Sequence, residues 1–433
     1  LNLSADTYDA LVSAINEANT AGGAVITLTS DITVTSAFPA ITSEIVIKGA
    51  YTLLRGSAYT GKFFTVNSGA TLTLDGGLTI DGNNDWILHK DVFLEHIRLG
   101  QYDSTFKSYI TPENDAPVST SNTFIVSGVL NIYSATVKNT YSTQSLLQVN
   151  TGGAVYLRAG ALITHNYRNN NAAVARIDTG AVLEMYDGSV VKENCGMHTG
   201  NNGQIFAVAG GMIMNGGEIC ENYISLAGII MTHYEADTTY PRPYFEMNGG
   251  RICHNAMLGG GWGDLIYVHH SASKGSVATI KGGVIEENIG RSSAGIHGNG
   301  RNAKVQILGG TVKLLKGLGP EGAKNHPLCT CDELLIGENV EVEGSGTTCY
   351  IIGFYTTNPP LIQNDGVLNF STYLFEPNVN NAIFNITGDG VWKGDVFKFA
   401  KTTKGGTNAI INSGTFIGDL QVDAGSITPS SHL

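Results

Sequence analysis

Rings, acids and imidazoles gather in one stretch of a chain that is otherwise poor in both aromatic and charged residues. Aromatic residues make up 8% of the 433 positions and charged residues 14%. The stretch from residue 223 to residue 301 combines flat apolar rings with fixed polar groups, which favours a sugar-binding surface on loops. The predicted ligand-binding residues are Tyr223, His233, Tyr234, Glu235, Arg242, Trp262, Asp264, Tyr267, His269 and Arg291, with Asp237, Tyr240, His270, His297 and Arg301 beside them.

The same stretch holds groups that could break a glycosidic bond. Hydrolysis needs an acid and a partner carboxylate about 5 to 9.5 Å apart, and Glu235, Asp237 and Asp264 are the candidates. Lyase chemistry needs a base beside a neutralised uronate, for which Arg242, His269 or His270 could serve. No arrangement matches a known catalytic signature, so the sequence favours binding over catalysis.

A candidate metal site lies earlier in the chain. Asp81, Asn83 and Asp85 alternate like the acceptors that open a calcium loop. Trp86 and Val92 stand where that loop needs glycine and glutamate, so the helix-loop-helix motif is not matched. We expect an Asx-rich turn here, with bound calcium as the weaker alternative, and no other cofactor.

The elements that position these residues form a repeat. A Gly-x-x-(Ile/Val)-x-x-Asn motif recurs at residues 160–166, 188–194, 216–222, 249–255 and 282–288, and its closing asparagines are 28, 28, 33 and 33 residues apart. Just before each copy lies a short alternation of apolar and polar residues, which predicts a strand. One such unit cannot bury its apolar side alone, so successive units must stack. The sequence therefore predicts a solenoid of parallel strands, with three strands in each coil.

Stacking would bring equivalent residues of successive coils together. The closing amides can bond one another and the backbone of their own turn, which predicts a structural ladder. Its members are Asn166, Asn194, Asn222, Asn255 and Asn288. One residue earlier runs a second column, which we expect to form a solvated face of mixed charge. Its members are His165, Glu193, Glu221, His254 and Glu287.

Two cysteines take the same place in adjacent coils. Cys220 and Cys253 should both point outward, because Thr164, Lys192 and Glu286 occupy that place elsewhere. In-register strands about 4.8 Å apart lie within disulfide range. A bridge and a pair of reduced thiols both fit this spacing.

The start of the chain predicts one helix. Tyr8, Leu11, Val12 and Ile15 form an apolar stripe that Asp6 opens and a Gly-Gly pair closes. Strand-like residues follow at 24–28 and 45–47. A helix over the first coil would cover an open sheet edge.

Together, the helix, residues 24–34, the segment 69–76 and the Gly-Gly-x-Ile-x-x-Asn coils resemble the right-handed parallel β-helix, or pectin-lyase-like, superfamily. They are particularly similar to β-helical repeats of bacterial surface proteins and adhesins. The resemblance covers about residues 5–425, and it implies an all-β, single-stranded right-handed parallel β-helix with an N-terminal capping α-helix and lateral loop insertions. A shared fold is weak evidence for function.

These patterns divide the chain into a capping helix at 1–23, a β-helix at 24–425 and a tail at 426–433. Residues 84–121 interrupt the repeat and predict a lateral insertion, and we expect irregular coils from about residue 316.

Composition excludes several classes of protein. A net charge of −12 without a Lys/Arg cluster excludes the usual nucleic-acid footprint. No apolar run approaches the roughly 18 to 20 residues that cross a bilayer, so we expect no membrane insertion. Six cysteines are too few for a disulfide scaffold in a chain of this length.

Three functions remain. The favoured one is an adhesin-like binding protein, extracellular or at the cell surface, whose partners are polysaccharides or glycoprotein glycans. The second is a polysaccharide lyase or glycoside hydrolase. The third is a phage tailspike or fibre that binds a receptor, which would form a homotrimer.

Overall fold

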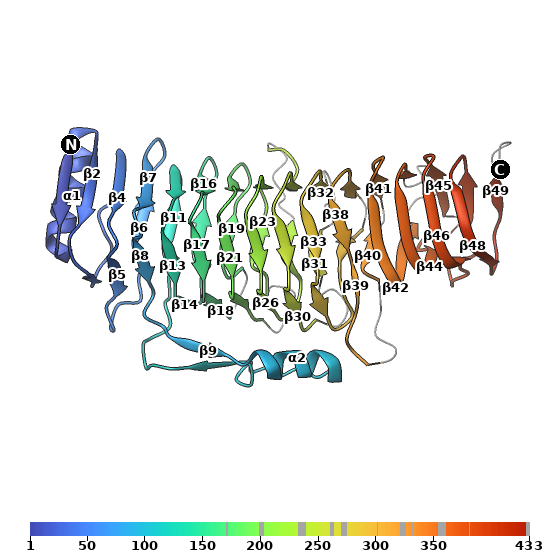
Figure 1. Ribbon diagram of the computed structural model, residues 1–433, viewed down its shortest axis with the longest axis horizontal. Helices are drawn as coiled ribbons and strands as arrows, with labels where there is room; N and C mark the ends of the chain where they lie inside the picture. The colour runs from blue at the N-terminus through green and yellow to red at the C-terminus, as the bar shows by residue number, and fades with distance from the viewer. Residues whose placement is uncertain are drawn as a thin grey trace.

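The computed structural model describes residues 1–169, 172–198, 203–232, 240–259, 264–269, 275–300, 302–320, 326–330, 332–353, 361–380 and 382–429. Over these residues the chain is an all-β solenoid with long parallel sheets, consistent with the predicted right-handed parallel β-helix. Figure 1 shows the coils arranged along one axis, with α1 at one end and β49 at the other.

Each regular coil contributes one strand to each of three walls. The first wall consists of β1 (Asn2–Ala5), β2 (Gly23–Leu28), β4 (Glu44–Lys48), β7 (Thr71–Asp75), β12 (Val129–Ile132), β16 (Ala154–Leu157), β20 (Val182–Met185), β24 (Gly211–Met214), β28 (Tyr244–Met247), β32 (Ser276–Ile280), β37 (Ala303–Ile307), β41 (Glu333–Ile336), β43 (Leu361–Asn364), β45 (Ile383–Thr387), β47 (Asn408–Ile411) and β49 (Ile427–Pro429). The second wall consists of β3 (Ile32–Val34), β5 (Thr52–Arg55), β8 (Thr79–Asp81), β13 (Thr136–Lys138), β17 (Leu162–Thr164), β21 (Val190–Lys192), β25 (Glu218–Cys220), β29 (Arg251–Cys253), β33 (Val284–Glu286) and β38 (Thr311–Lys313). The third wall consists of β6 (Phe64–Val66), β11 (Phe124–Val126), β15 (Leu147–Val149), β19 (Ala175–Ile177), β23 (Phe206–Val208), β27 (Gly228–Thr232), β31 (Asp264–Val268), β36 (Ile296–Gly298) and β40 (Leu328–Thr330).

A short fourth sheet lies at the corner between the second and third walls. This corner sheet consists of β14 (Tyr141–Ser142), β18 (Tyr167–Arg168), β22 (Cys195–Gly196), β26 (Tyr223–Ile224), β30 (Ala256–Met257) and β34 (Ile289–Gly290). Its strands pair in parallel, with Tyr167, Cys195 and Tyr223 in one column. The sequence analysis did not predict this sheet, because two-residue strands are too short to show a period.

The core runs along the axis because alternate residues of each strand point inward. In the first wall Val155 pairs with Leu183 and Leu157 with Met185, and all four side chains are buried. The period of two therefore makes a continuous apolar column from each inward position. Burial of each such side chain contributes roughly 1.5 to 3 kcal/mol.

The C-terminal coils differ from the prediction. We expected irregular coils after about residue 316, but the strands there lengthen and stay largely in register. They are β42 (Glu341–Gly353), β44 (Val367–Pro377), β46 (Val391–Phe399) and β48 (Thr415–Val422), and each runs through both the second and third walls. Stacked rings hold this part together, with centroids 4.5 Å apart for Phe375 and Phe399. The predicted tail at 426–433 is also partly strand, because β49 pairs with the otherwise free edge of β47.

The N-terminal helix is α1 (Tyr8–Ala21), which packs on the end of the core through Leu11, Ala14, Ile15 and Ala18. Its N-cap is Thr7 rather than the predicted Asp6, since the Thr7 side chain accepts a hydrogen bond from the Ala10 backbone N–H at 3.3 Å. The edge strand β1, which pairs with β2, precedes the helix and was not predicted.

The lateral insertion folds on the outside of the solenoid. It contains β9 (Trp86–Leu88), α2 (Lys90–Leu99) and β10 (Ile110–Pro112), and β9 pairs with β10 in antiparallel fashion. At its base the Asn84 amide donates to the backbone oxygens of Ala116 and Pro117. Figure 1 shows α2 running alongside the corner sheet. A second antiparallel pair, β35 (Ser293–Ala294) with β39 (Leu315–Lys316), lies farther along the chain.

Candidate functional site

Those predicted ligand-binding residues that the structure describes lie on several different surfaces. His233, Tyr234, Glu235, Asp237, Trp262, His270 and Arg301 lie outside the described residues. Tyr223 lies on the corner sheet under the insertion. Tyr240 and Arg242 lie at the first wall, whereas Asp264, Tyr267, His269 and His297 lie at the third wall. Arg291 comes close to Gly100, the residue that caps the end of α2.

A pocket of about 310 Å³ opens on the outer face of the first wall. It is lined by Gly180, Ala181, Val182, Gly210, Gly211, Tyr240, Pro241, Arg242 and Tyr244. Val182, Gly211 and Tyr244 are in register on three neighbouring strands. We call this the first-wall pocket.

Glycines form the floor of the first-wall pocket. A Cβ atom on Gly211 would lie 2.4 Å from Cζ of Tyr244, and one on Gly180 would lie 2.6 Å from Cε1 of Tyr240. Any larger residue would therefore displace the two rings. Burial, with the nearby carboxylates of Glu184 and Glu246, raises the pKa of Tyr244, so its phenol remains a neutral donor.

A buried acid–histidine pair lies at the third wall. Oδ2 of Asp264 is 3.2 Å from Nδ1 of His297, and the two side chains are only 5% and 9% exposed. The ring of Tyr267 stands 5.5 Å from that of His297 and 5.8 Å from that of His269. Within the described part of the chain, Asp264 thus pairs with an imidazole. Such a carboxylate can orient a histidine for proton transfer.

The five asparagines form one buried column at the corner after the second wall. Nδ2 of each of the first four donates to Oδ1 of the next, at 3.0 Å from Asn166 to Asn194 and 2.9 Å from Asn255 to Asn288. The backbone N–H of each of the first four also donates to the next Oδ1, as at Asn222 with Asn255 (3.0 Å). Each Nδ2 also reaches a carbonyl of the preceding coil, for example Val191 from Asn222. The column therefore satisfies the corner's backbone groups without any ligand.

The residues before the asparagines share a left-handed backbone. His165, Glu193, Glu221, His254 and Glu287 have φ between 52° and 55°. This conformation costs a non-glycine residue roughly 1 to 2 kcal/mol, and it turns these side chains away from the buried amides. We call them the corner column.

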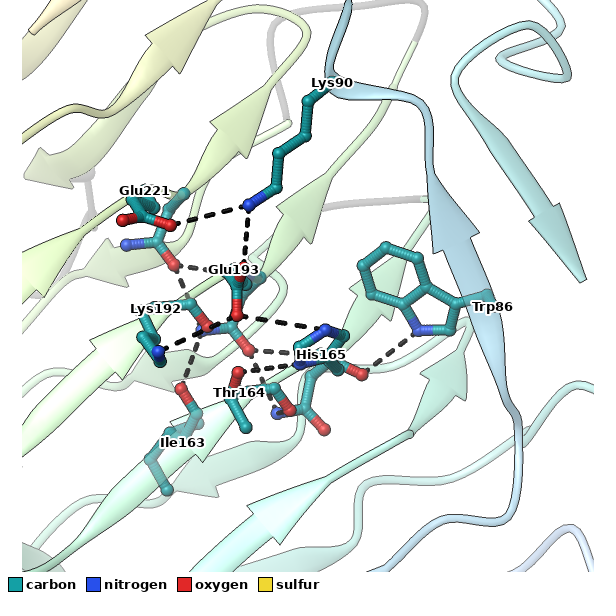
Figure 2. A network of polar contacts seen from close by, with 11 residues as sticks. Trp86, Lys90, Ile163, Thr164, His165, Lys192, Glu193 and Glu221 are labelled. Atoms are coloured by element: carbon teal, nitrogen blue, oxygen red, sulfur yellow. Dashed lines mark hydrogen bonds and ion pairs between the residues drawn. The ribbon is translucent and has the colours of Figure 1, made fainter.

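The insertion contacts the corner column through Lys90 and Trp86, as Figure 2 shows. Nζ of Lys90 lies 2.7 Å from Oε1 of Glu193 and 3.5 Å from Oε2 of Glu221. The Trp86 indole N–H donates to the His165 carbonyl at 3.1 Å. The expectation of a solvated face holds for His254 and Glu287, which are 48% and 56% exposed, but Glu193 is only 20% exposed beneath Lys90.

The electrostatics of this contact favour the charged forms. Burial opposes the charge on Lys90, but the hydrogen bond to Glu193 and the nearby carboxylates outweigh it and raise the Lys90 pKa. Burial likewise opposes the charge on Glu193, but Lys90, His165 and Lys192 lower its pKa. Both groups therefore stay ionised at neutral pH.

An apolar cluster explains why the insertion docks here. Phe93 and Ile97 of α2 pack against the outward side of the corner sheet, including Tyr167, Cys195 and Tyr223. The Phe93 and Tyr223 rings meet edge to face at 5.2 Å. Burial raises the pKa of Tyr223 to about 12. Tyr223 is thus a packing residue, not an exposed ligand-binding one.

The two cysteines form a disulfide. Cys220 and Cys253 pair in register, and a bond joins their sulfur atoms. Both side chains leave the core side of the strand, as predicted, but they are 7% and 1% exposed rather than solvated. Each sulfur shields the other, which the alternation pattern alone could not reveal.

Amide and ammonium groups surround the carboxylates of the candidate calcium segment. Oδ1 of Asp81 accepts from the Asn83 backbone N–H at 2.8 Å, and Oδ2 lies 3.4 Å from Nζ of Lys138. The Asn139 amide donates to Oδ1 of Asp85 at 2.8 Å. These contacts form an Asx turn, and the ammonium group beside it disfavours a cation. In the described parts of the chain, no three His, Cys, Asp or Glu side chains group as metal ligands.

Sequence analysis missed a tyrosine cluster on the first wall. Arg158 lies with its guanidinium among the rings of Tyr133, Tyr156 and Tyr186. The signal was present, because Tyr156 takes an outward position of its strand and Tyr133 and Tyr186 directly follow theirs.

No protein-family model matches the chain, and no curated protein resembles it significantly. Neither helix in the described residues is long and apolar enough to cross a membrane.

Proposed function

We propose that this protein is an adhesin-like binding protein, extracellular or at the cell surface, that holds glycans on the outer face of its first wall. The first-wall pocket carries the proposal. Tyr240 and Tyr244 supply flat apolar faces, Arg242 supplies hydrogen-bond donors, and the glycine floor lets the rings lie against the sheet. Such a mixture of rings and few polar groups suits a sugar ring with its hydroxyls.

The surroundings of the pocket support the same proposal. The disulfide between Cys220 and Cys253 is a feature of oxidising compartments outside the cytosol. A rigid solenoid holds the two tyrosines of the pocket on adjacent parts of one wall, so the site needs little ordering when a ligand arrives. The resemblance to bacterial surface β-helices and the pectin-lyase-like superfamily fits this role.

Calorimetric titration with oligosaccharides tests the proposal. We expect Tyr244→Ala to weaken binding about tenfold, since one ring contact is worth roughly 1 kcal/mol or more. Tyr51→Ala is the matched control, because Tyr51 is 39% exposed near the N-terminal end of the rod, several coils away from the pocket. Equal affinity in both variants, or no binding to any saccharide on a glycan array, would contradict the proposal.

The buried pair of Asp264 and His297 favours a second candidate, a polysaccharide lyase or glycoside hydrolase on the same scaffold. This candidate predicts new reducing ends or unsaturated products from a polysaccharide, and their loss in Asp264→Asn. Intact substrate after prolonged incubation would exclude it.

A further inference from the structure

The guanidinium of Arg158 is held between aromatic rings. Arg158 directly follows β16, and its Cζ lies 4.0 Å from the ring centroid of Tyr186 and 4.9 Å from that of Tyr156. The ring of Tyr133 is 6.0 Å away, and Tyr133 is 38% exposed. Stacking of this kind fixes a guanidinium in place.

Among the residues that the structure describes, this cation has no counter-ion. Nε of Arg158 is buried without a hydrogen-bond partner, and its guanidinium makes no hydrogen bond or ion pair with any residue that the structure describes. The terminal nitrogens, unlike Nε, are not fully buried. They are therefore open to an external acceptor.

The neighbouring carboxylate is already engaged. Oε2 of Glu184 accepts from the Tyr186 hydroxyl at 2.5 Å and from the Asn215 amide at 3.4 Å. This hydrogen bond holds the Tyr186 ring beside the guanidinium. Arg158 is left with a free N–H edge, which matches a carboxylate or a sulfate in bidentate geometry.

The cluster lies on the same wall as the first-wall pocket. Val182 at the start of β20 lines the pocket, and Tyr186 directly follows the end of β20. The rise of a strand places the two sites roughly 13 Å apart. An extended chain of a few sugar rings could contact both.

We propose that Arg158 and the rings of Tyr156 and Tyr186 bind the anionic group of an acidic sugar, either a carboxylate or a sulfate, with the rings packing against the saccharide. The inference rests on the proposed glycan-binding function and names its ligand class. The pocket supplies general sugar contacts, and Arg158 supplies the preference for negative charge.

Titration with three oligosaccharides of equal length tests the preference: a polyuronate, a sulfated neutral-sugar oligomer and an uncharged one. We expect wild-type protein to bind one or both charged probes at least tenfold more tightly than the uncharged probe, and increasing salt to reduce the difference. The stronger charged probe identifies the source of the anion. Equal binding of all three would overturn the inference.

Variants separate the charge from the fold. Arg158→Gln should abolish the charge preference, and Arg158→Lys should not restore it. Arg98→Gln on the exposed side of α2 is the matched control. If Arg158→Gln keeps the preference while Tyr244→Ala weakens all probes, this inference fails and the pocket proposal stands.

A direct measurement covers the case in which no oligosaccharide binds. The Arg158 Nε–H resonance, assigned by its absence in Arg158→Gln, should shift on titration with free glucuronate or inorganic sulfate. A resonance that stays fixed with both anions would overturn the inference independently of the proposed function.

Discussion

The asparagine column makes a strong prediction at its middle member. In Asn222→Ala the two N–H groups of Asn194 lose the acceptor Oδ1, to which they now donate at 3.1 Å. The carbonyls of Val191 and Cys220 and Oδ1 of Asn255 each lose a donor at 3.0 to 3.1 Å. Each buried group left unsatisfied costs about 1 to 3 kcal/mol. Because these groups share partners, we expect a total loss of about 3 to 5 kcal/mol.

Hydrogen exchange on the native protein measures this loss of stability locally, at the asparagine column. A solenoid need not unfold in one step, so the exchange rate of the Asn194 backbone amide is more informative than a global melt. Asn248→Ala is the matched control, because Asn248 is exposed and its amide donates to Oδ1 of Asn215 at 2.9 Å on the surface of the first wall. We expect the control to cost less than about 0.5 kcal/mol. If the two substitutions have equal effects, the amides are not what stabilises the corner.

Three other perturbations have definite expected outcomes. Cys253→Ala, which leaves Cys220 as a free thiol, should lower the free energy of unfolding in denaturant by about 3 to 4 kcal/mol, because the disulfide closes a loop of 33 residues. Full reduction of the wild-type disulfide should have the same effect. A smaller effect would mean that packing compensates for the lost bond. Lys90→Met should cost less than about 1 kcal/mol. This difference should persist at neutral pH and disappear as pH falls through the lowered pKa of Glu193 or rises through the raised pKa of Lys90, and a pH-independent difference would contradict the ion pair. Gly211→Ala should change thermal stability little, because the clashing atom is the mobile end of a tyrosine, yet it should weaken saccharide binding; unchanged affinity would show that the ring position is irrelevant.

The repeat predicted the architecture because each coil carries the same short sequence motif. A glycine, an inward Ile or Val and a closing asparagine recur at a fixed offset, so the stacking and the column of Asn166 to Asn288 follow from the spacing. The helix α2 escaped prediction because only Phe93 and Ile97 bury their side chains, which is too short a stripe to show a helical period.

The candidate site was harder to predict because the length of a coil does not show between which two strands its extra residues are inserted. After Asn222 the extra residues lie between the third wall and the next first-wall strand, whereas after Asn255 they lie on both sides of β31. Tyr223 and Arg242 are therefore on different faces although both follow the same asparagine. Residue type indicated the chemistry, but only the path of the chain decided which groups meet.

The direction of the amide contacts along the rod has one further consequence. Each of the first four asparagines donates its backbone N–H forward, to the side-chain Oδ1 of an asparagine in the coil that is synthesised next. During synthesis, the most recently folded coil would thus have an asparagine N–H without an acceptor. The next coil would supply that acceptor and would add an unsatisfied N–H of its own. This one-way dependence favours the addition of coils in order, from the N-terminal end to the C-terminal end.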